Sequence, residues 1–165
     1  MADNMRTTND VDADAYQLTL SIANRANEFA PMSRRLGDAE SRASQAIAVL
    51  ERPTVTAQEW QEAEASLKAL EAACRDAAGL ADCFEEEGQA AKLRAEGLGK
   101  ECSALQTTSG GPSVDECKYE ADGARADAGN KLIAKGQALK TRVGWNQGEG
   151  DVVEQLKEKI KQHHT

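Results

Sequence analysis

The sequence predicts an all-α protein, an elongated antiparallel three-helix bundle with a short C-terminal helix. Three observations point to this fold class. Of the 165 residues, 40% are hydrophobic but only 4% are aromatic, a composition that suits closely packed helices better than sheets. Apolar residues recur every three to four positions along most of the chain, which is the helical period. Short turn-like segments separate these stretches, and such loops return the chain beside the preceding helix.

The central helix is expected over residues 56–106. It opens at Thr56 and Glu59, which are spaced as a capping box, and it ends before the Gly-Gly-Pro turn at 110–112. Its apolar stripe keeps a coiled-coil heptad spacing over more than six heptads, and only Gly88 interrupts it. The stripe consists of Trp60, Ala63, Leu67, Leu70, Cys74, Ala77, Ala81, Phe84, Gly88, Ala91, Ala95, Leu98, Cys102 and Leu105.

Two further long helices and a short one complete the predicted bundle. After a flexible N-terminus (1–11), a helix over 12–51 is interrupted by Pro31. Because proline removes a backbone donor and clashes with the preceding turn, a kink or a junction of two helices is expected there. A third helix spans 113–143, "GWNQGEG" ends it, and a terminal helix covers 151–163. Residues 12–163 are expected to form a single domain.

Four glycines are the predicted weak points of the central helix: Gly79, Gly88, Gly97 and Gly99. Each costs about 1 kcal/mol relative to alanine in a helix interior. A break at one or more of them would produce the alternative fold, a compact four- or five-helix bundle. Unbroken helices instead predict a rod of roughly 70 Å, since about 50 residues rise about 1.5 Å each.

Cys102 and Cys117 stand on either side of the loop between the second and third helices. In an antiparallel hairpin they lie level with each other, and both belong to the inward stripes. Facing helices place their Cα atoms within the range that a disulfide needs. A disulfide is therefore expected, with two buried free thiols as the alternative.

Cys74 and Cys83 are harder to pair. Nine residues apart in an unbroken helix, they would lie roughly 13.5 Å apart on opposite faces. If all four cysteines are oxidised, pairing by elimination therefore predicts a local break near Gly79. A zinc site or a thioredoxin-like redox site is disfavoured, because the sequence contains no C-x-x-C.

The charge distribution excludes some partners. The net charge is −8, and between Thr56 and Glu101 eleven acidic residues face five basic ones. Such a surface repels phosphate backbones and anionic membranes, so nucleic acid is not an expected partner. No stretch of 18 apolar residues offers a membrane span, and the first residues, "MADNMRTTND", do not read as a signal peptide.

The polar groups give little sign of catalysis. His163 and His164, the only two histidines, sit near a terminus and are expected to be solvated. The acidic stretch "DCFEEEG" (82–88) is expected to be a solvated helix face, because calcium requires oxygens that converge from a loop. No base and orienting group accompany the serines, and "TTSGGPS" lacks the P-loop lysine. The sequence therefore predicts no enzyme, cofactor or metal site.

The two tryptophans differ in their surroundings. Trp60 fits a seam position in the central helix and is expected in the core. Trp145 lies within "GWNQGEG", among residues that favour irregular backbone. It either plugs the end of the bundle or projects as a binding anchor, and it is the partner-binding candidate.

The sequence thus predicts a non-enzymatic helical protein for recognition, coat or scaffold work. An even number of cysteines with one well-placed pair suits an oxidising compartment, so an extracellular or cell-surface location with the signal peptide removed is expected. This architecture resembles the elongated, disulfide-clasped helical-bundle surface proteins of parasitic protozoa, which implies a coat or receptor ectodomain that binds a protein. The alternative is a cytoplasmic adaptor or secretion-associated scaffold with reduced cysteines, and a homo-oligomer formed through the helical seam stays open.

Overall fold

The computed structural model describes residues 6–105 and 111–164. Over these residues the regular elements are all helical. By their contacts they divide into two compact units, one from Met1–Asn27 and Asp82–Gly136 and the other from Glu28–Ala81 and Gln137–Thr165. The elements are α1 (Thr8–Ala26), α2 (Phe29–Leu50), α3 (Ala57–Cys102), α4 (Val114–Gly123), the π-helix η2 (Ala124–Gly129), α5 (Asn130–Gln147) and α6 (Val152–His164).

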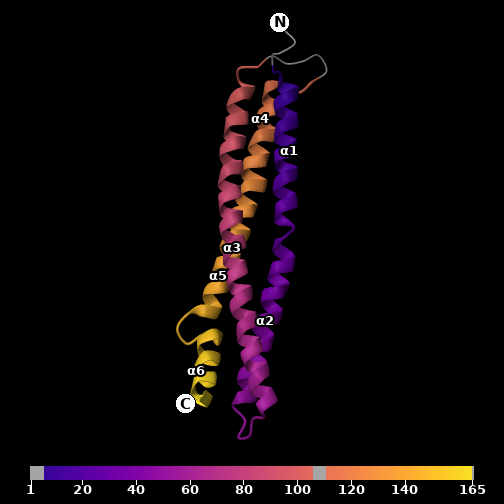
Figure 1. Cartoon of the computed structure of the whole chain (residues 1–165). Helices are drawn as coiled ribbons and strands as arrows, with labels where there is room; N and C mark the ends of the chain where they lie inside the picture. The colour runs from indigo at the N-terminus through magenta and orange to yellow at the C-terminus, as the bar shows by residue number, and fades with distance from the viewer. Residues whose placement is uncertain (1–5, 106–110, 165) are drawn as a thin grey trace. The chain divides into compact units, whose positions relative to one another are not determined.

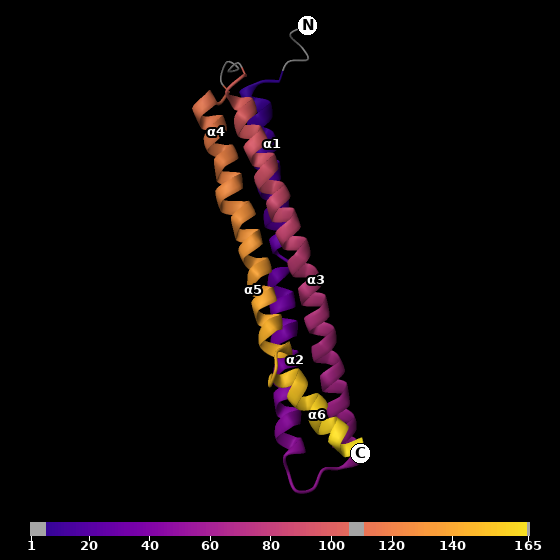
Figure 2. The ribbon, with the colours of Figure 1, turned by 90° about the vertical axis from the view of Figure 1, so that its left-hand side faces the viewer.

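Each unit is built from helices that pack side by side. In the first unit, α1, the second half of α3 and the α4–η2 segment form one group (Figure 1). In the second unit, α2, the first half of α3, the end of α5 and α6 form the other (Figure 2). The predicted all-α bundle of three helical segments with a short terminal helix is confirmed.

Helix α1 begins at Thr8, four residues earlier than the predicted start at 12, because a capping box precedes it. The Thr7 backbone N–H donates to the Asp10 carboxylate (2.9 Å), and the Asp10 N–H donates to Thr7 Oγ1 (3.4 Å). Thr8 is fully buried and donates its hydroxyl to the Pro112 carbonyl (2.6 Å). Residues 1–5 of the predicted flexible N-terminus lie outside the described residues.

The interruption that Pro31 predicts lies three to four residues before the proline itself. A turn at Asn27 and Glu28, both of which keep right-handed helical dihedral angles, separates α1 from α2, and α2 starts at Phe29. Pro31 therefore occupies the first turn of α2, where a backbone N–H has no partner within the helix. Its ring would clash with the carbonyl four residues earlier, which belongs to Asn27. The result is a junction between two helices, α1 and α2, in place of one continuous helix.

The second predicted helix is continuous. Helix α3 runs from Ala57 to Cys102 without interruption at any of its glycines. The first unit buries Phe84 and Leu98 from this helix, and a fully buried cluster joins α1, α3 and α4. That cluster contains Val11, Ala15, Leu98, Cys102, Cys117 and Ala121. Leu70 of α3, Leu36 of α2 and Leu156 of α6 form part of the second unit's core.

Gly88 interrupts the apolar stripe because another helix approaches it closely. A Cβ atom built on Gly88 would lie 2.5 Å from Ile133 Cγ1 and 2.9 Å from the Gly129 carbonyl oxygen. Gly129 is the last residue of η2, and a Cβ there would lie 2.9 Å from Lys92 Cγ. Neither glycine has room for a side chain, so the pair brings two backbones of the first unit together.

The third predicted helix is divided into three elements. Helix α4 begins at Val114 behind the Ser113 cap, η2 inserts a π-helical segment, and α5 continues to Gln147, four residues beyond the predicted end at 143. Gly150, at a φ of 79°, provides the turn before α6. Its left-handed backbone is accessible to glycine at little cost.

Candidate functional site

Cys102 and Cys117 meet at one end of the first unit. Their sulfur atoms lie at disulfide distance, and their Cα atoms are 6.0 Å apart. Both side chains are fully buried. Cys102 is the last residue of α3, and Ser113 accepts the Glu116 N–H (3.1 Å) to start α4 just before Cys117. The pairing predicted from the hairpin register is therefore the one that the structure brings together.

Cys74 and Cys83 are free thiols. The break near Gly79 that their pairing would require is not present, since α3 is continuous through this stretch. Burial raises the pKa of the Cys74 thiol, and the nearby Glu40 and Glu71 carboxylates raise it further. Because the thiolate is the reactive form, Cys74 is a poor nucleophile at neutral pH.

Trp145 is on a helix and in solvent. It lies on the last turns of α5, and 68% of its surface is exposed. The expected irregular backbone is not found, and the plug interpretation does not fit this exposure. The neighbouring Asn146 takes the inward position instead, with only 2% of its surface exposed. A lone exposed aromatic is common on protein surfaces, but tryptophan is the residue type most enriched at binding hot spots.

Trp145→Ala is expected to leave stability nearly unchanged. The side chain buries little surface, and exposed substitutions usually shift the free energy of unfolding by no more than about 0.5 kcal/mol. Thermal denaturation followed by circular dichroism measures the effect. A loss of about 3 kcal/mol or more, typical of a buried tryptophan, would contradict the exposed position.

A polar network fixes the inward face beside Trp145. Arg142 donates to the Ser33 hydroxyl (2.7 Å), the Ser33 carbonyl (3.1 Å) and the Glu40 carboxylate (2.7 Å). Asn146 donates to the other Glu40 oxygen (2.9 Å). Ser33 and Glu40 belong to α2, so these bonds hold α5 on α2 within the second unit. The network explains why α5 stays helical as far as Gln147.

Arg142→Ala is expected to lower the free energy of unfolding by about 1–3 kcal/mol, because it leaves partly buried Glu40 without its cation. Asp76→Ala is the matched control. It breaks the Arg35–Asp76 ion pair, in which both side chains are about half exposed (49% and 52%), so it should cost less than about 1 kcal/mol. Urea denaturation of the two variants compares them. Equal losses would show that the Arg142 network contributes no more than a surface pair.

The C-terminal histidines make contacts that the sequence did not predict. His163 stacks on Trp60, with ring centroids 3.8 Å apart and planes inclined by 11°. The His164 ring nitrogen lies 2.9 Å from a Glu64 carboxylate oxygen. Both histidines are exposed, as expected, while Trp60 is only partly buried under His163. The one available signal was the amphipathic pattern of residues 151–163, which packs α6 against α2 within the second unit.

The acidic stretch 82–88 forms no metal site. Glu87 pairs with Arg25 (2.7 Å), whose guanidinium also lies 5.7 Å from the Phe84 ring centroid. Within residues 6–105 and 111–164, no group of three or more histidine, cysteine, aspartate and glutamate side chains is arranged to hold a metal ion. The described helices also include none with the length and apolar content needed to cross a membrane.

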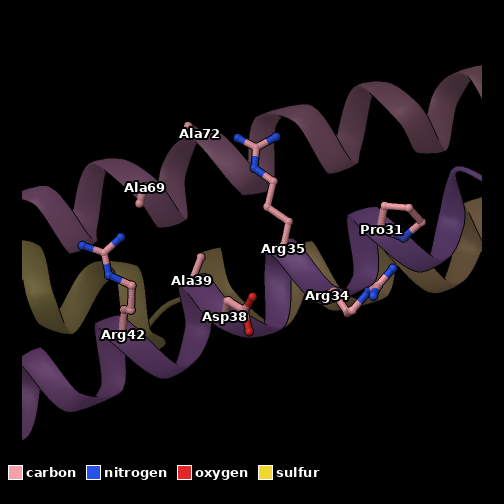
Figure 3. Close-up of a pocket in the computed structure, with 8 residues that line it drawn as sticks. All are labelled: Pro31, Arg34, Arg35, Asp38, Ala39, Arg42, Ala69 and Ala72. Carbon is pink, nitrogen blue, oxygen red and sulfur yellow. The ribbon is translucent and has the colours of Figure 1, made fainter.

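A furrow lies between α2 and α3 in the second unit. The part lined by residues 31–42 of α2 and by Ala69 and Ala72 of α3 has a volume of about 560 Å³, with Arg34, Arg35 and Arg42 on the α2 side. Figure 3 shows Arg35 and Arg42 reaching from α2 toward α3, where Ala69 and Ala72 lie. Small-molecule pockets are usually lined by hydrophobic and aromatic groups, whereas this lining consists of alanines, a proline, three arginines and an aspartate. The furrow therefore suits a macromolecular surface better than a small apolar ligand.

Neither a family model, nor a curated protein, nor a solved structure matches this chain.

Proposed function

We propose that this chain is a non-enzymatic recognition or coat protein, an extracellular surface ectodomain that binds a protein partner. The observation that supports this most directly is the position of Trp145, held outward on α5 while Arg142 and Asn146, on the adjacent inward face, bond to α2. A large rigid aromatic on a fixed helix presents binding area at little cost in conformational entropy. Alanine-rich helix faces elsewhere offer less anchoring area.

The extracellular location is supported by the cysteine pair. Cys102 and Cys117 lie at disulfide distance across the end of a helical hairpin. Disulfides persist in oxidising compartments and are rare in the cytosol. The free thiols Cys74 and Cys83 are equally compatible with a reducing compartment, which keeps an intracellular adaptor or secretion-associated scaffold as the second candidate.

Binding to a panel of purified extracellular ectodomains tests the proposal. For a genuine partner, Trp145→Ala should weaken binding by about 2 kcal/mol, or about 30-fold. Tyr119→Ala is the control, because Tyr119 is 80% exposed but lies in the other unit. Partners that bind the wild type and Trp145→Ala equally well would count against Trp145 as the anchor.

Thiol alkylation in the native cells decides between the two locations. Because Cys102 and Cys117 are buried, the alkylation is carried out in denaturant. If the protein is extracellular, these two cysteines should resist alkylation until a reductant is added, while the free Cys83 reacts. Modification of Cys102 and Cys117 without reductant would favour the intracellular adaptor.

A further inference from the structure

The start of α1 is bonded to the loop that the Cys102–Cys117 pair encloses. Thr8, the first residue of α1, is fully buried and donates its hydroxyl to the Pro112 carbonyl (2.6 Å). Pro112 lies between the two cysteines in the sequence, just before α4 begins. Helices α1 and α4 pack against each other at this end of the first unit (Figure 1). The hydroxyl bond therefore joins α1 to the end of the α3–α4 hairpin.

A group of four charges holds the residue just before the cap of α1. Arg6 donates to the Asp14 carboxylate (2.8 Å) and to the Glu101 carboxylate (2.9 Å). Arg94 lies 3.6 Å from Asp14 and 3.9 Å from Glu101, so each carboxylate has two cationic partners. The four side chains are 37–53% exposed, and exposed ion pairs are individually weak. We call residues 6–11 the N-terminal strap; one buried hydrogen bond and several weak ion pairs hold it.

The cysteine pair is buried beneath the N-terminal strap. Val11 of the strap and Ala15 of the next turn belong to the same buried cluster as Cys102 and Cys117. None of these four residues has any exposed surface. Thiol–disulfide exchange depends on access to the sulfur atoms. A dissolved thiol therefore reaches the pair only when a neighbouring segment moves.

Helix α1 is the neighbour that can move aside. Of the described helices in the buried cluster, α3 and α4 carry the two sulfur atoms and cannot leave them. Helix α1 has no covalent link to the pair, and its start is held by the Thr8 hydroxyl and the Arg6 ion pairs. Local opening occurs most readily where few buried contacts have to break. Lifting the strap is therefore an easier route to the sulfur atoms than separating α3 from α4.

We propose that the N-terminal strap is a redox-operated latch. A thiol reductant reaches the Cys102–Cys117 bond only after the strap has lifted. Its thiolate then attacks one sulfur, forms a mixed disulfide with it and displaces the other cysteine as a thiolate. A second thiol resolves the mixed disulfide, so that two external thiols leave as a disulfide and each cysteine ends as a thiol.

Reduction in turn should release the strap. The Pro112 carbonyl is held between two helix ends that the Cys102–Cys117 bond joins. Once that bond is broken, the hairpin end is free to fray, and Thr8 loses a fixed acceptor. Coupling between two equilibria is reciprocal, so if lifting the strap favours reduction, reduction favours the lifted strap by the same factor. The strap therefore stays closed in an oxidising compartment and opens in a reducing one.

The rate at which dithiothreitol reduces the folded protein tests the latch. Maleimide traps the released thiols, and peptide mapping locates them. Thr8→Val removes the hydroxyl donor and should speed the reduction about fivefold, the factor that corresponds to one hydrogen bond. Thr19→Val is the matched control, because the Thr19 hydroxyl donates to the Ala15 carbonyl (3.0 Å) within α1 itself. This variant should be reduced at the wild-type rate.

Arg6→Ala tests the charges separately, and the partly exposed Arg6 side chain is not part of the core. The substitution breaks both Arg6 ion pairs and should speed the reduction at least about threefold. Arg125→Ala is its control, because it breaks the exposed Arg125–Asp122 pair (3.0 Å) of the same unit and should leave the rate unchanged. Equal rates in the wild type, Thr8→Val and Arg6→Ala would overturn the proposal.

The dependence of the reduction rate on urea separates local from global opening. Lifting the strap exposes little surface. Well below the unfolding transition, the logarithm of the rate should therefore rise with urea at less than about half the slope of global unfolding. A slope equal to the global one would mean that the whole fold has to open first, and it would overturn the proposal.

Trypsin measures the reciprocal effect, because Arg6 lies in the strap. The protease can cleave after Arg6 only when this side chain has left its two carboxylates. In Cys102→Ala/Cys117→Ala, cleavage after Arg6 should accelerate at least about fivefold more than cleavage after Arg35. Arg35 lies in the second unit and reports the general loss of stability. Equal acceleration at both sites would show that the disulfide does not hold the strap, and it would overturn the proposal.

Discussion

Gly88→Ala is expected to lower the free energy of unfolding by about 1–3 kcal/mol, even though alanine is the better helix former. The added Cβ would lie 2.5 Å from Ile133 Cγ1 and 2.9 Å from the Gly129 carbonyl oxygen. Ile133 can adjust its rotamer, but the Gly129 backbone can yield only if η2 moves away from α3. The loss of packing over this contact outweighs the gain of about 1 kcal/mol in helix propensity.

Gly97→Ala is the matched control in the same helix and the same unit. A Cβ at Gly97 has no neighbouring atom within 4 Å, so this variant should be more stable by up to about 1 kcal/mol. Gly79 is equally open, and Gly79→Ala should behave alike. If the close approach is correct, urea denaturation should show a lower free energy of unfolding than the wild type for Gly88→Ala and a higher one for Gly97→Ala and Gly79→Ala. A stabilised Gly88→Ala variant would show that α3 and η2 do not touch there.

Reduction of the Cys102–Cys117 pair is expected to cost about 3 kcal/mol of stability. The two cysteines are 15 residues apart, and a cross-link closing a loop of this length removes about that much chain entropy from the unfolded state. The effect should appear as a lower urea midpoint in the presence of reductant. Cys102→Ala/Cys117→Ala should match the reduced wild type closely and respond to reductant no further.

Cys83→Ser controls for general effects of thiols, because Cys83 is free and only partly buried. It should keep the full response to reductant. Peptide mapping of the oxidised protein identifies the bond directly. Linkage of Cys102 or Cys117 to Cys74 or Cys83 would contradict the hairpin register.

The features predicted best from the sequence depend on local spacing. The Thr56–Glu59 capping box forms, with the Thr56 N–H donating to Glu59 at 2.9 Å, and this bond lowers the pKa of the Glu59 carboxyl. The level placement of Cys102 and Cys117 follows from two helix ends and a short loop. Such arguments need only the geometry of one helix or one hairpin.

The features that the sequence did not predict depend on contacts between distant residues. Arg142 and Glu40 are 102 positions apart. The need for glycine at position 88 is explained only by the close approach of Gly129, which lies on another element. "GWNQGEG" has the composition of a loop, yet Trp145 is helical because Arg142 and Asn146 bond to α2. Here tertiary contacts override local propensity.

The π-helical segment η2 also bears on changes in chain length. Each residue of an α-helix turns the chain by about 100°, whereas a π-helix holds an additional residue per turn. Deleting exposed Ala126 or Asp127 would let 124–129 become ordinary α-helix with its backbone bonds intact. Because the π-helical turn absorbs that residue, α5 would keep its rotation and Leu139 would stay buried. Deleting one residue of η2 should therefore disturb the hydrophobic core far less than deleting one residue from the α-helical turns of α5, which would rotate every later residue by about 100°.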